Sequence, residues 1–189
     1  MLCENLSFEH ICKNCQISFL APSIYKRKIL NKIEVISFYK YSELKELLHT
    51  KHTDIGYYIY SILAKNSLKK FASEFKFENK VVSIAIDDGI KSGYSHTAIL
   101  NKALCSKFIK PQFNRLRAKN SVSYSGKSRE FRLLNPRNFE LKNLKNQDLI
   151  LVDDIITTGL TFTQAIEIAE KNNNTVLFCI ALADASQIS

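Results

Sequence analysis

Hydrophobic residues follow two kinds of pattern along the chain: short, nearly continuous apolar runs, and longer stretches with apolar residues three or four positions apart. A short apolar run that ends in polar residues is typical of a strand buried on both faces of a sheet. Spacing of three and four residues indicates a helix that packs along one side. The predicted strands cover 33–41, 80–88, 113–116, 148–152 and 175–183. The predicted helices cover 43–48, with Ser42 as N-cap, 54–71, 95–108 and 160–172.

Strands and helices alternate in this pattern from residue 80 to residue 183. Such alternation predicts an α/β fold with a parallel sheet and right-handed crossovers. The chain has 189 residues, 46% of them apolar, which is enough for one domain with a substantial core. We therefore expect a domain over residues 23–189, preceded by a short cysteine-containing segment at residues 1–22.

The composition excludes several classes of protein. Five glycines and three prolines argue against a fibrous or low-complexity chain. A membrane-spanning helix needs a run of about 18 or more apolar residues, and the sequence contains none, so we expect no membrane insertion. The first residues lack the basic stretch and apolar run of a signal peptide, which predicts a cytoplasmic location.

Residues 149–161 form the most informative motif of the sequence. Four apolar residues lead into two aspartates and two isoleucines, and the chain then passes through threonines and a glycine into the next predicted helix. The motif consists of Leu149, Ile150, Leu151, Val152, Asp153, Asp154, Ile155, Ile156, Thr157, Thr158, Gly159, Leu160 and Thr161. Because ligands of open parallel sheets bind at the carboxyl ends of strands, this motif predicts a ligand site.

The residue types of the motif suit a phosphorylated sugar. A helix N-terminus offers unpaired N–H groups and a partial positive charge, and Gly159 lets the backbone approach a phosphate closely. The hydroxyl groups of Thr157, Thr158 and Thr161 can donate further hydrogen bonds. Two ionised carboxylates would repel a bare phosphate, so we expect Asp153 and Asp154 to accept hydrogen bonds from ribose hydroxyls. The motif thus predicts ribose on the two acids and a 5′-phosphate in the loop.

This motif resembles the signature with which type I phosphoribosyltransferases bind phosphoribosyl pyrophosphate (PRPP). The wider chain resembles the ComF/ComFC family of competence proteins, a branch of those transferases linked to DNA uptake and natural transformation. The resemblance runs from the N-terminal cysteines through 38–47, 84–96 and 117–139 to the PRPP motif. It implies a type I phosphoribosyltransferase-like parallel sheet flanked by helices, PRPP bound with Mg²⁺, and Asp153 and Asp154 as the catalytic residues.

The resemblance also implies a pyrophosphate-binding loop after the strand at 80–88, where Asp87 and Asp88 lie. Family members commonly have Pro-Val-Pro and then Arg-Gly-Phe-Asn-Gln, whereas this chain has Ile-Ala-Ile at 84–86 and Ser-Gly-Tyr-Ser-His at 92–96. Lys91 is the candidate cation in place of the missing contacts. His96 lies on the first turn of a predicted helix, where it either contacts pyrophosphate or serves as a capping or core residue.

Positive charge is concentrated in one part of the chain. The formal net charge is +9; residues 1–145 hold 26 Lys and Arg against 12 acids, and residues 146–189 hold one Lys against six acids. A basic surface attracts phosphates or nucleic acid, although a solvated Lys-rich surface fits the global charge equally well. Residues 117–139 are basic and lack periodicity, and the resemblance implies that they form a flexible region beside the active site. The candidate pyrophosphate or DNA contacts are Lys91, Arg117, Lys127, Arg129, Arg132 and Arg137.

The N-terminal segment carries a Cys-x-x-Cys pair, which is the spacing of tetrahedral zinc sites. The family usually has a second such pair, but position 6 holds a leucine. Our hypothesis is a zinc site, because a segment with no core of its own needs a staple; a site without metal and a redox pair are the alternatives. The hypothetical ligands are Cys3, His10, Cys12 and Cys15. Cys105 and Cys179 lie on apolar faces, and we expect both thiols to be buried.

Two functions fit these observations. The first is a ComF-like protein that binds PRPP with Mg²⁺ and serves DNA uptake; if it transfers phosphoribose, a nitrogen nucleophile displaces pyrophosphate from ribose C1. The second is a single-stranded DNA-binding factor that uses the fold without turnover, with basic and aromatic residues of 110–145 along the strand. A helicase or another part of the uptake machinery is the expected protein partner. A transcriptional regulator with PRPP as effector is weaker, because no helix-turn-helix pattern occurs.

Overall fold

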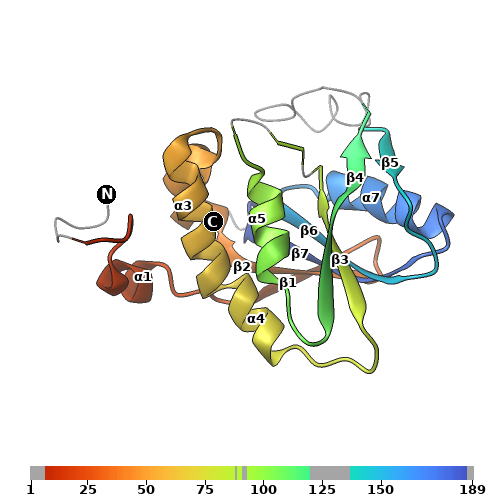
Figure 1. Ribbon diagram of the computed structural model, residues 1–189, viewed down its shortest axis with the longest axis horizontal. Coiled ribbons are helices and arrows are strands. Elements are labelled where there is room, and N and C mark those ends of the chain that lie inside the picture. The colour runs from red at the N-terminus through yellow and green to blue at the C-terminus, as the bar shows by residue number, and fades with distance from the viewer. Residues whose placement is uncertain (1–6, 88, 91–92, 120–136, 187–189) are drawn as a thin grey trace.

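The computed structural model describes residues 7–87, 89–90, 93–119 and 137–186, which form one sheet covered by helices (Figure 1). The strands are β1 (Tyr25–Ile29), β2 (Ile33–Lys40), β3 (Val81–Ile86), β4 (Ile109–Ala118), β5 (Phe139–Leu141), β6 (Asp148–Ile156) and β7 (Thr175–Asp184). The helices are α1 (Lys13–Phe19), α2 (Tyr41–His49), the 3-10 turn η1 (Thr50–His52), α3 (Asp54–Asn66), α4 (Leu68–Glu74), α5 (His96–Ala103) and α7 (Leu160–Lys171).

The sheet has seven strands in the order β1-β2-β7-β6-β3-β4-β5. The five inner strands pair in parallel, and the two edge strands pair antiparallel to their neighbours. This arrangement confirms the expected α/β fold with a parallel sheet flanked by helices. Because all inner strands run the same way, the chain leaves β3 and β6, which are neighbours, at the same edge of the sheet.

The alternation of side chains along β6 divides the core between the two faces of the sheet. Ile150 and Val152 pack in a cluster with residues of the helices α2 to α5. Leu149 and Leu151 point the other way, into a cluster with residues of α7. Since successive side chains of a strand alternate between faces, the two aspartates that follow are also directed to opposite faces.

Several predicted elements differ from the structure in their bounds. The helix expected over 54–71 is two helices, because the chain bends at Ser67, whose hydroxyl donates to the carbonyl of Leu63 at 2.6 Å. The residue before α2 is Lys40, so the expected N-cap Ser42 lies inside the helix. The strand expected over 148–152 continues to Ile156, because β7 pairs with it beyond the two aspartates.

The sequence pattern missed three short elements at the periphery. The edge strand β1 has three consecutive charged residues, β5 has only three residues, and α1 lies within the segment expected as a zinc-binding region. Ile11, Cys15 and Leu20 of that segment pack in the same core cluster as α3. The prediction for Cys179 is confirmed, but Cys105 is exposed, because α5 ends before it. Among the described residues, no helix is long and apolar enough to cross a membrane.

Replacing either of two serines by alanine tests this account of the fold, because the two changes in the free energy of unfolding should have opposite signs. Ser83 is fully buried in β3, and its hydroxyl has no hydrogen-bond partner among the described residues. Ser95 caps α5 by accepting from the amide of Ala98 at 3.1 Å. Since an unpaired buried hydroxyl destabilises the fold, we expect Ser83→Ala to raise the free energy of unfolding by about 1 kcal/mol. We expect Ser95→Ala to lower it by about 1 kcal/mol, measured by urea denaturation. A loss of stability in Ser83→Ala would contradict the packing described for β3.

Candidate functional site

The two aspartates of β6 lie where the strand loses one neighbour and keeps the other. On one side β6 pairs with β3 only from Leu149 to Val152. On the other side it pairs with β7 as far as Ile156, so Asp153 and Asp154 have a partner strand on that side alone. The open side exposes the end of β6 to the loop that follows β3. Both candidate acids therefore stand at the carboxyl edge of the parallel sheet, as expected for a ligand site.

Asp154 points toward the face covered by α3 and α5, where it is held by three donors. The ammonium group of Lys51 lies 2.9 Å from its Oδ2 atom, and Nε2 of His96 lies 3.3 Å from the same atom. The hydroxyl of Tyr60 donates to Oδ2 at 3.5 Å. Within the described residues, all three interactions go to Oδ2. The carboxylate is thus fixed in orientation by donors that reach one of its two oxygens.

The surroundings of the two carboxyl groups shift their pKa values in opposite directions. Burial raises the pKa of Asp154, but the hydrogen bond from His96 and the charge of Lys51 outweigh burial, so its pKa is lowered. Burial and the charge on Asp154 raise the pKa of Asp153 well above its ordinary value, and Arg137 only partly opposes them. Burial also lowers the pKa of Lys51, but Asp154 outweighs this and raises it. Asp154 and Lys51 therefore form a charged pair at neutral pH.

The loop after β6 has the local geometry of a helix N-terminus open to a ligand. Gly159 has φ +83°, the left-handed region that favours glycine, and it is the residue before α7. A Cβ at this position would lie 2.9 Å from Cγ2 of Ile29, so no larger residue fits without a shift. The amide of Thr163 is the donor to the carbonyl of Gly159, at 2.9 Å. The preceding amides of the first turn have no acceptor within the helix, and that of Leu160 donates to Oγ1 of Thr158 at 3.5 Å. Amides in this position commonly bind phosphate.

The pyrophosphate loop expected after β3 is described in part. Asp87 follows Ile86 with a left-handed φ of +52°, and its amide donates to the carbonyl of Leu116 at 3.0 Å. Its carboxylate lies 3.3 Å from Nη1 of Arg137, whose own amide donates to Oε1 of Gln164. Arg137 thus joins the end of β3 to α7. Asp88 and Lys91 lie outside the described residues.

The basic candidates are described only at the two ends of their segment. Arg117 is exposed on β4, where its side chain donates to Oδ1 of Asn114. It directly follows Leu116, whose carbonyl accepts from Asp87, so β4 brings it to the same edge of the sheet. Lys127, Arg129 and Arg132 lie outside the described residues.

The proposed zinc ligands take other roles where they are described. The Cys12 Sγ atom accepts from the amide of Cys15 at 3.4 Å and caps α1. The ring of His10 stacks on Tyr58 with 4.0 Å between centroids. No three His, Cys, Asp or Glu residues of the described ranges form a group that could hold a metal. Since Cys3 lies outside these ranges, the zinc site stays a prediction.

Three residues of this site were missed or left open by the sequence pattern. Lys51 and Tyr60 were not predicted, because they precede Asp154 by 103 and 94 residues and no local spacing connects them. For His96 the sequence allows either a pyrophosphate contact or a capping or core role. Ser95 is the N-cap of α5, and His96 turns its ring to Asp154.

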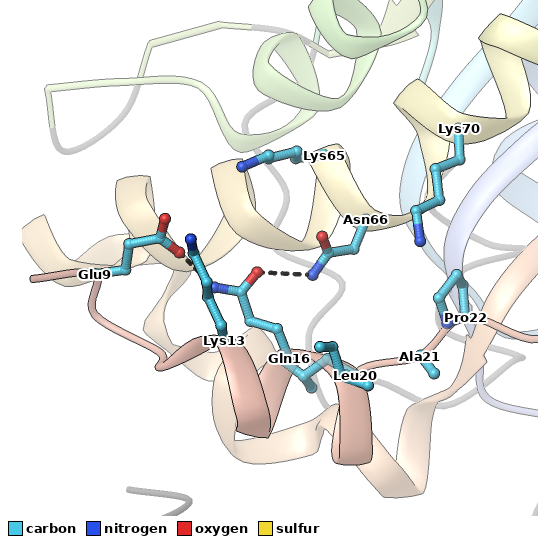
Figure 2. A pocket seen from close by; sticks show the side chains of 10 residues that line it. Glu9, Lys13, Gln16, Leu20, Ala21, Pro22, Lys65, Asn66 and Lys70 are labelled. Atoms are coloured by element: carbon cyan, nitrogen blue, oxygen red, sulfur yellow. Dashed lines mark hydrogen bonds between the residues drawn. The ribbon is translucent and has the colours of Figure 1, made fainter. Parts of the chain in front are cut away.

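Among the described residues, surface hollows occur beside α1 and beside β5. The larger, of about 330 Å³, lies between α1 and the helices α3 and α4. Figure 2 shows Lys13, Lys65 and Lys70 around it, with Gln16 joined by hydrogen bonds to Glu9 and Asn66. The second, of about 290 Å³, lies between β5 and α7 and is lined by Gln164, the acceptor for Arg137.

The stabilities of the two aspartate variants test the opposite pKa shifts. The lowered pKa of Asp154 stabilises the fold above pH about 4, and this contribution is lost as the pH falls through the lowered pKa. The raised pKa of Asp153 has the opposite sign: its contribution is present at low pH and is lost as the pH rises through the raised pKa. At pH 7 we expect Asp154→Asn to lower the free energy of unfolding by about 3 kcal/mol. We expect Asp153→Asn to raise it by about 1 kcal/mol.

Urea titrations between pH 3 and pH 8 measure both differences. The difference in the free energy of unfolding between wild type and Asp154→Asn should shrink toward the acid end of the range, because the wild-type carboxylate begins to lose its charge-dependent stabilisation there. The gain of Asp153→Asn should shrink in the same direction, since both wild-type and variant side chains are then neutral. Equal effects of the two substitutions at pH 7 would contradict the assignment of Asp154 as the charged member.

Comparison with known proteins gives a family match over most of the chain. The model of the PRTase-CE family matches residues 19–188. The transcriptional regulator GfcR of Methanosphaera stadtmanae is 43% identical over 42 residues, which are 22% of this chain and 21% of GfcR. The match to GfcR thus spans about a fifth of that relative. The finer resemblance to ComF/ComFC remains a prediction.

Solved phosphoribosyltransferase structures show a lower similarity. A hypoxanthine phosphoribosyltransferase from Staphylococcus aureus is 16% identical with a TM-score of 0.40, over 66% of this chain and 62% of that chain. The hypoxanthine phosphoribosyltransferase from Trypanosoma cruzi, in complex with the product IMP, is 20% identical with a TM-score of 0.39, over 66% of this chain and 65% of that chain. This chain therefore spans less than two thirds of either enzyme.

Proposed function

This chain belongs to the PRTase-CE family, and from that premise we propose that it binds PRPP with Mg²⁺ at the carboxyl edge of β6, in the cytoplasm. One arrangement carries the proposal. Asp154 is charged and fixed in orientation, and the turn at Gly159 then leads into the N-terminus of α7. A carboxylate beside a phosphate-binding helix terminus suits a ribose phosphate, which presents hydroxyls and a 5′-phosphate a few ångströms apart.

Each part of the proposed ligand has a partner in this site. The ribose hydroxyls donate to Asp153 and to Oδ1 of Asp154, and the amides of the 157–161 loop bind the 5′-phosphate. The pyrophosphate lies toward Asp87 and Arg137, at the end of β3. Magnesium ions favour oxygen ligands and are commonly held by one or two carboxylates together with substrate phosphates, which the carboxylates of Asp87 and Asp153 fit. Bound Mg²⁺ would neutralise charge on the departing pyrophosphate.

If the bound PRPP reacts, the step is a displacement at ribose C1. A nitrogen nucleophile forms the new bond to C1 with its lone pair, and the C1–oxygen bond breaks with its electrons on pyrophosphate. The protein's contribution is to hold the ribose on Asp153 and Asp154 while the loop fixes the 5′-phosphate, so that C1 faces the acceptor. Arg137 offers positive charge on the side where the leaving group gains negative charge.

Calorimetry in Mg²⁺ buffer tests the proposal. We expect PRPP to bind with micromolar affinity and the double variant Asp153→Asn/Asp154→Asn to bind at least roughly tenfold more weakly, because it loses the charge-assisted hydrogen bond at Asp154 and one carboxyl oxygen at Asp153. The matched control is Asp148→Asn at the other end of β6, which should leave the affinity unchanged. Wild-type protein that does not bind PRPP would overturn the proposal, as would equal loss in the control.

A second candidate function is single-stranded DNA binding in the course of DNA uptake, as the resemblance to ComF proteins implies. The observation in its favour is the charge distribution, with 26 of the 27 Lys and Arg in residues 1–145. Arg117 is an exposed member of this set on β4, at the edge of the sheet that carries the proposed PRPP site. A helicase or another component of the uptake machinery is the proposed protein partner.

The salt dependence of DNA binding distinguishes this function from non-specific adhesion. For a fluorescent single-stranded oligonucleotide, log Kd should rise with log salt by roughly 0.7 per phosphate contacted. We expect Arg117→Gln to reduce the slope by about one contact. The control is Lys171→Gln, which removes the single Lys of residues 146–189 and should not change the slope. Binding without salt dependence, or equal effects of both variants, would exclude this surface.

A further inference from the structure

Arg27, on the edge strand β1, reaches the loop that is proposed to bind the 5′-phosphate. Its Nη2 atom donates a hydrogen bond to the carbonyl oxygen of Thr157. Its Nε atom lies 3.2 Å from Oδ2 of Asp184, at the end of β7. The side chain is about a quarter exposed, whereas that of Asp184 is 3% exposed. One guanidinium group therefore connects the phosphate loop to a buried carboxylate 27 residues further along the chain.

Asp184 is itself fixed by contacts that leave it no freedom to follow the arginine. Its Oδ1 atom accepts from the amide of Ser186 at 2.8 Å and from the hydroxyl of Ser186 at 2.7 Å. It pairs in register with Ile156 on β6 and with Lys40 on β2. The anchor for Arg27 is thus part of the sheet, and the ion pair holds the guanidinium group in one place relative to the loop.

The hydrogen bond to Thr157 also determines the direction of an amide in the loop. In a trans peptide the C=O of one residue and the N–H of the next lie in one plane and point in opposite directions. Holding the carbonyl oxygen of Thr157 therefore directs the N–H of Thr158 away from Arg27. A second contact from β1 acts two residues later, where Ile29 occupies the space beside Gly159. The edge strand thus supports both ends of the turn.

We propose that Arg27 is a positioning residue that presets the 157–159 turn for the 5′-phosphate of the ligand. The proposal rests on the proposed PRPP site and adds to it a residue from a strand outside the binding motif. Arg27 suits this role because its planar guanidinium group can donate to a carboxylate and a carbonyl in fixed geometry, whereas a lysine ammonium group is a point charge on a flexible stem. A preset turn does not need to be ordered when the ligand arrives, so the affinity is higher.

The alternative is that Arg27 only stabilises the fold through its ion pair with Asp184. Both roles predict some loss of stability in a variant, so stability alone cannot separate them. The difference lies in the loop: a positioning role requires that PRPP affinity falls further than stability explains, and that the amides of the loop lose protection while the rest of the sheet keeps it.

The test compares Arg27→Gln and Arg27→Lys with Lys28→Gln, which removes an exposed charge from the same strand. Calorimetry gives PRPP affinity, and hydrogen exchange gives the protection of residues 157–161 and of β6. We expect both Arg27 variants to bind PRPP roughly tenfold or more weakly, with faster exchange in the loop and unchanged exchange in β6. Lys28→Gln should match the wild type, and millimolar guanidinium chloride should partly restore the affinity of Arg27→Gln.

The possible outcomes separate the two proposals. Wild-type protein that fails to bind PRPP overturns the proposed function and this inference with it. Wild-type binding with unchanged affinity in Arg27→Gln overturns the inference alone. Equal loss of protection in the loop and in β6, without rescue by guanidinium, also overturns it, because that result indicates general destabilisation.

Discussion

The buried carboxylate of Asp154 is the constraint around which one face of the sheet, the face covered by α2 to α5, is organised. An ionised group can be buried only when donors replace the water that it loses, and each donor must arrive with good geometry. Here the donors come from η1 and α3, which follow each other in the sequence, and from α5, which comes after α4 and β3. The end of β6, the start of α5 and the turn before α3 are consequently held at one point, beside the proposed ribose position.

The surroundings of the adjacent Asp153 raise its pKa, whereas those of Asp154 lower it, although only one peptide bond separates the two residues. Strand alternation directs it to the α7 face, where Arg137 opposes only part of the effects of burial and of the charge on Asp154. Its Oδ1 atom accepts from the amide of Asp154 at 2.8 Å, and Arg137 is already paired with Asp87. A carboxyl group left in this condition costs stability in the absence of a ligand. Retaining it makes physical sense if a bound cation or hydroxyl completes its surroundings.

Local sequence carried the information for the sheet and for the phosphate turn, because both depend on neighbours in the chain. The apolar run at 149–152, the two acids and Gly159 were enough to place a strand, its carboxyl end and a helix start. The donors to Asp154 could not be predicted in this way, because Lys51 lies 103 residues before Asp154 and reaches it only through the tertiary fold. The role of Arg27 could not be predicted either, because it lies on a short edge strand whose polar sequence resembles that of a loop.

The bounds of the elements failed where tertiary contacts override local preference. β6 extends past its two aspartates because β7 pairs with it as far as Ile156, and the sequence of β6 alone does not predict this pairing. Ser67 ends α3 through a side chain that bonds to its own preceding turn, and the helical spacing of apolar residues passes through this break without a signal. The termini of elements are also where the site residues lie, so the errors in bounds and the missed site residues have a common origin.

The two edges of the sheet support the two halves of the proposed site. On one edge β1 contacts the phosphate turn through Arg27 and Ile29. Toward the other edge, the backbone of β4 holds the amide of Asp87, and Arg137, just before β5, holds its carboxylate. Arg27, Ile29 and Arg137 lie outside the parallel strands, whereas β4 is itself one of them. A parallel sheet fixes where its strands end but not how the following loops turn. In this protein the edge strand β1, the neighbouring strand β4 and Arg137 supply that second constraint.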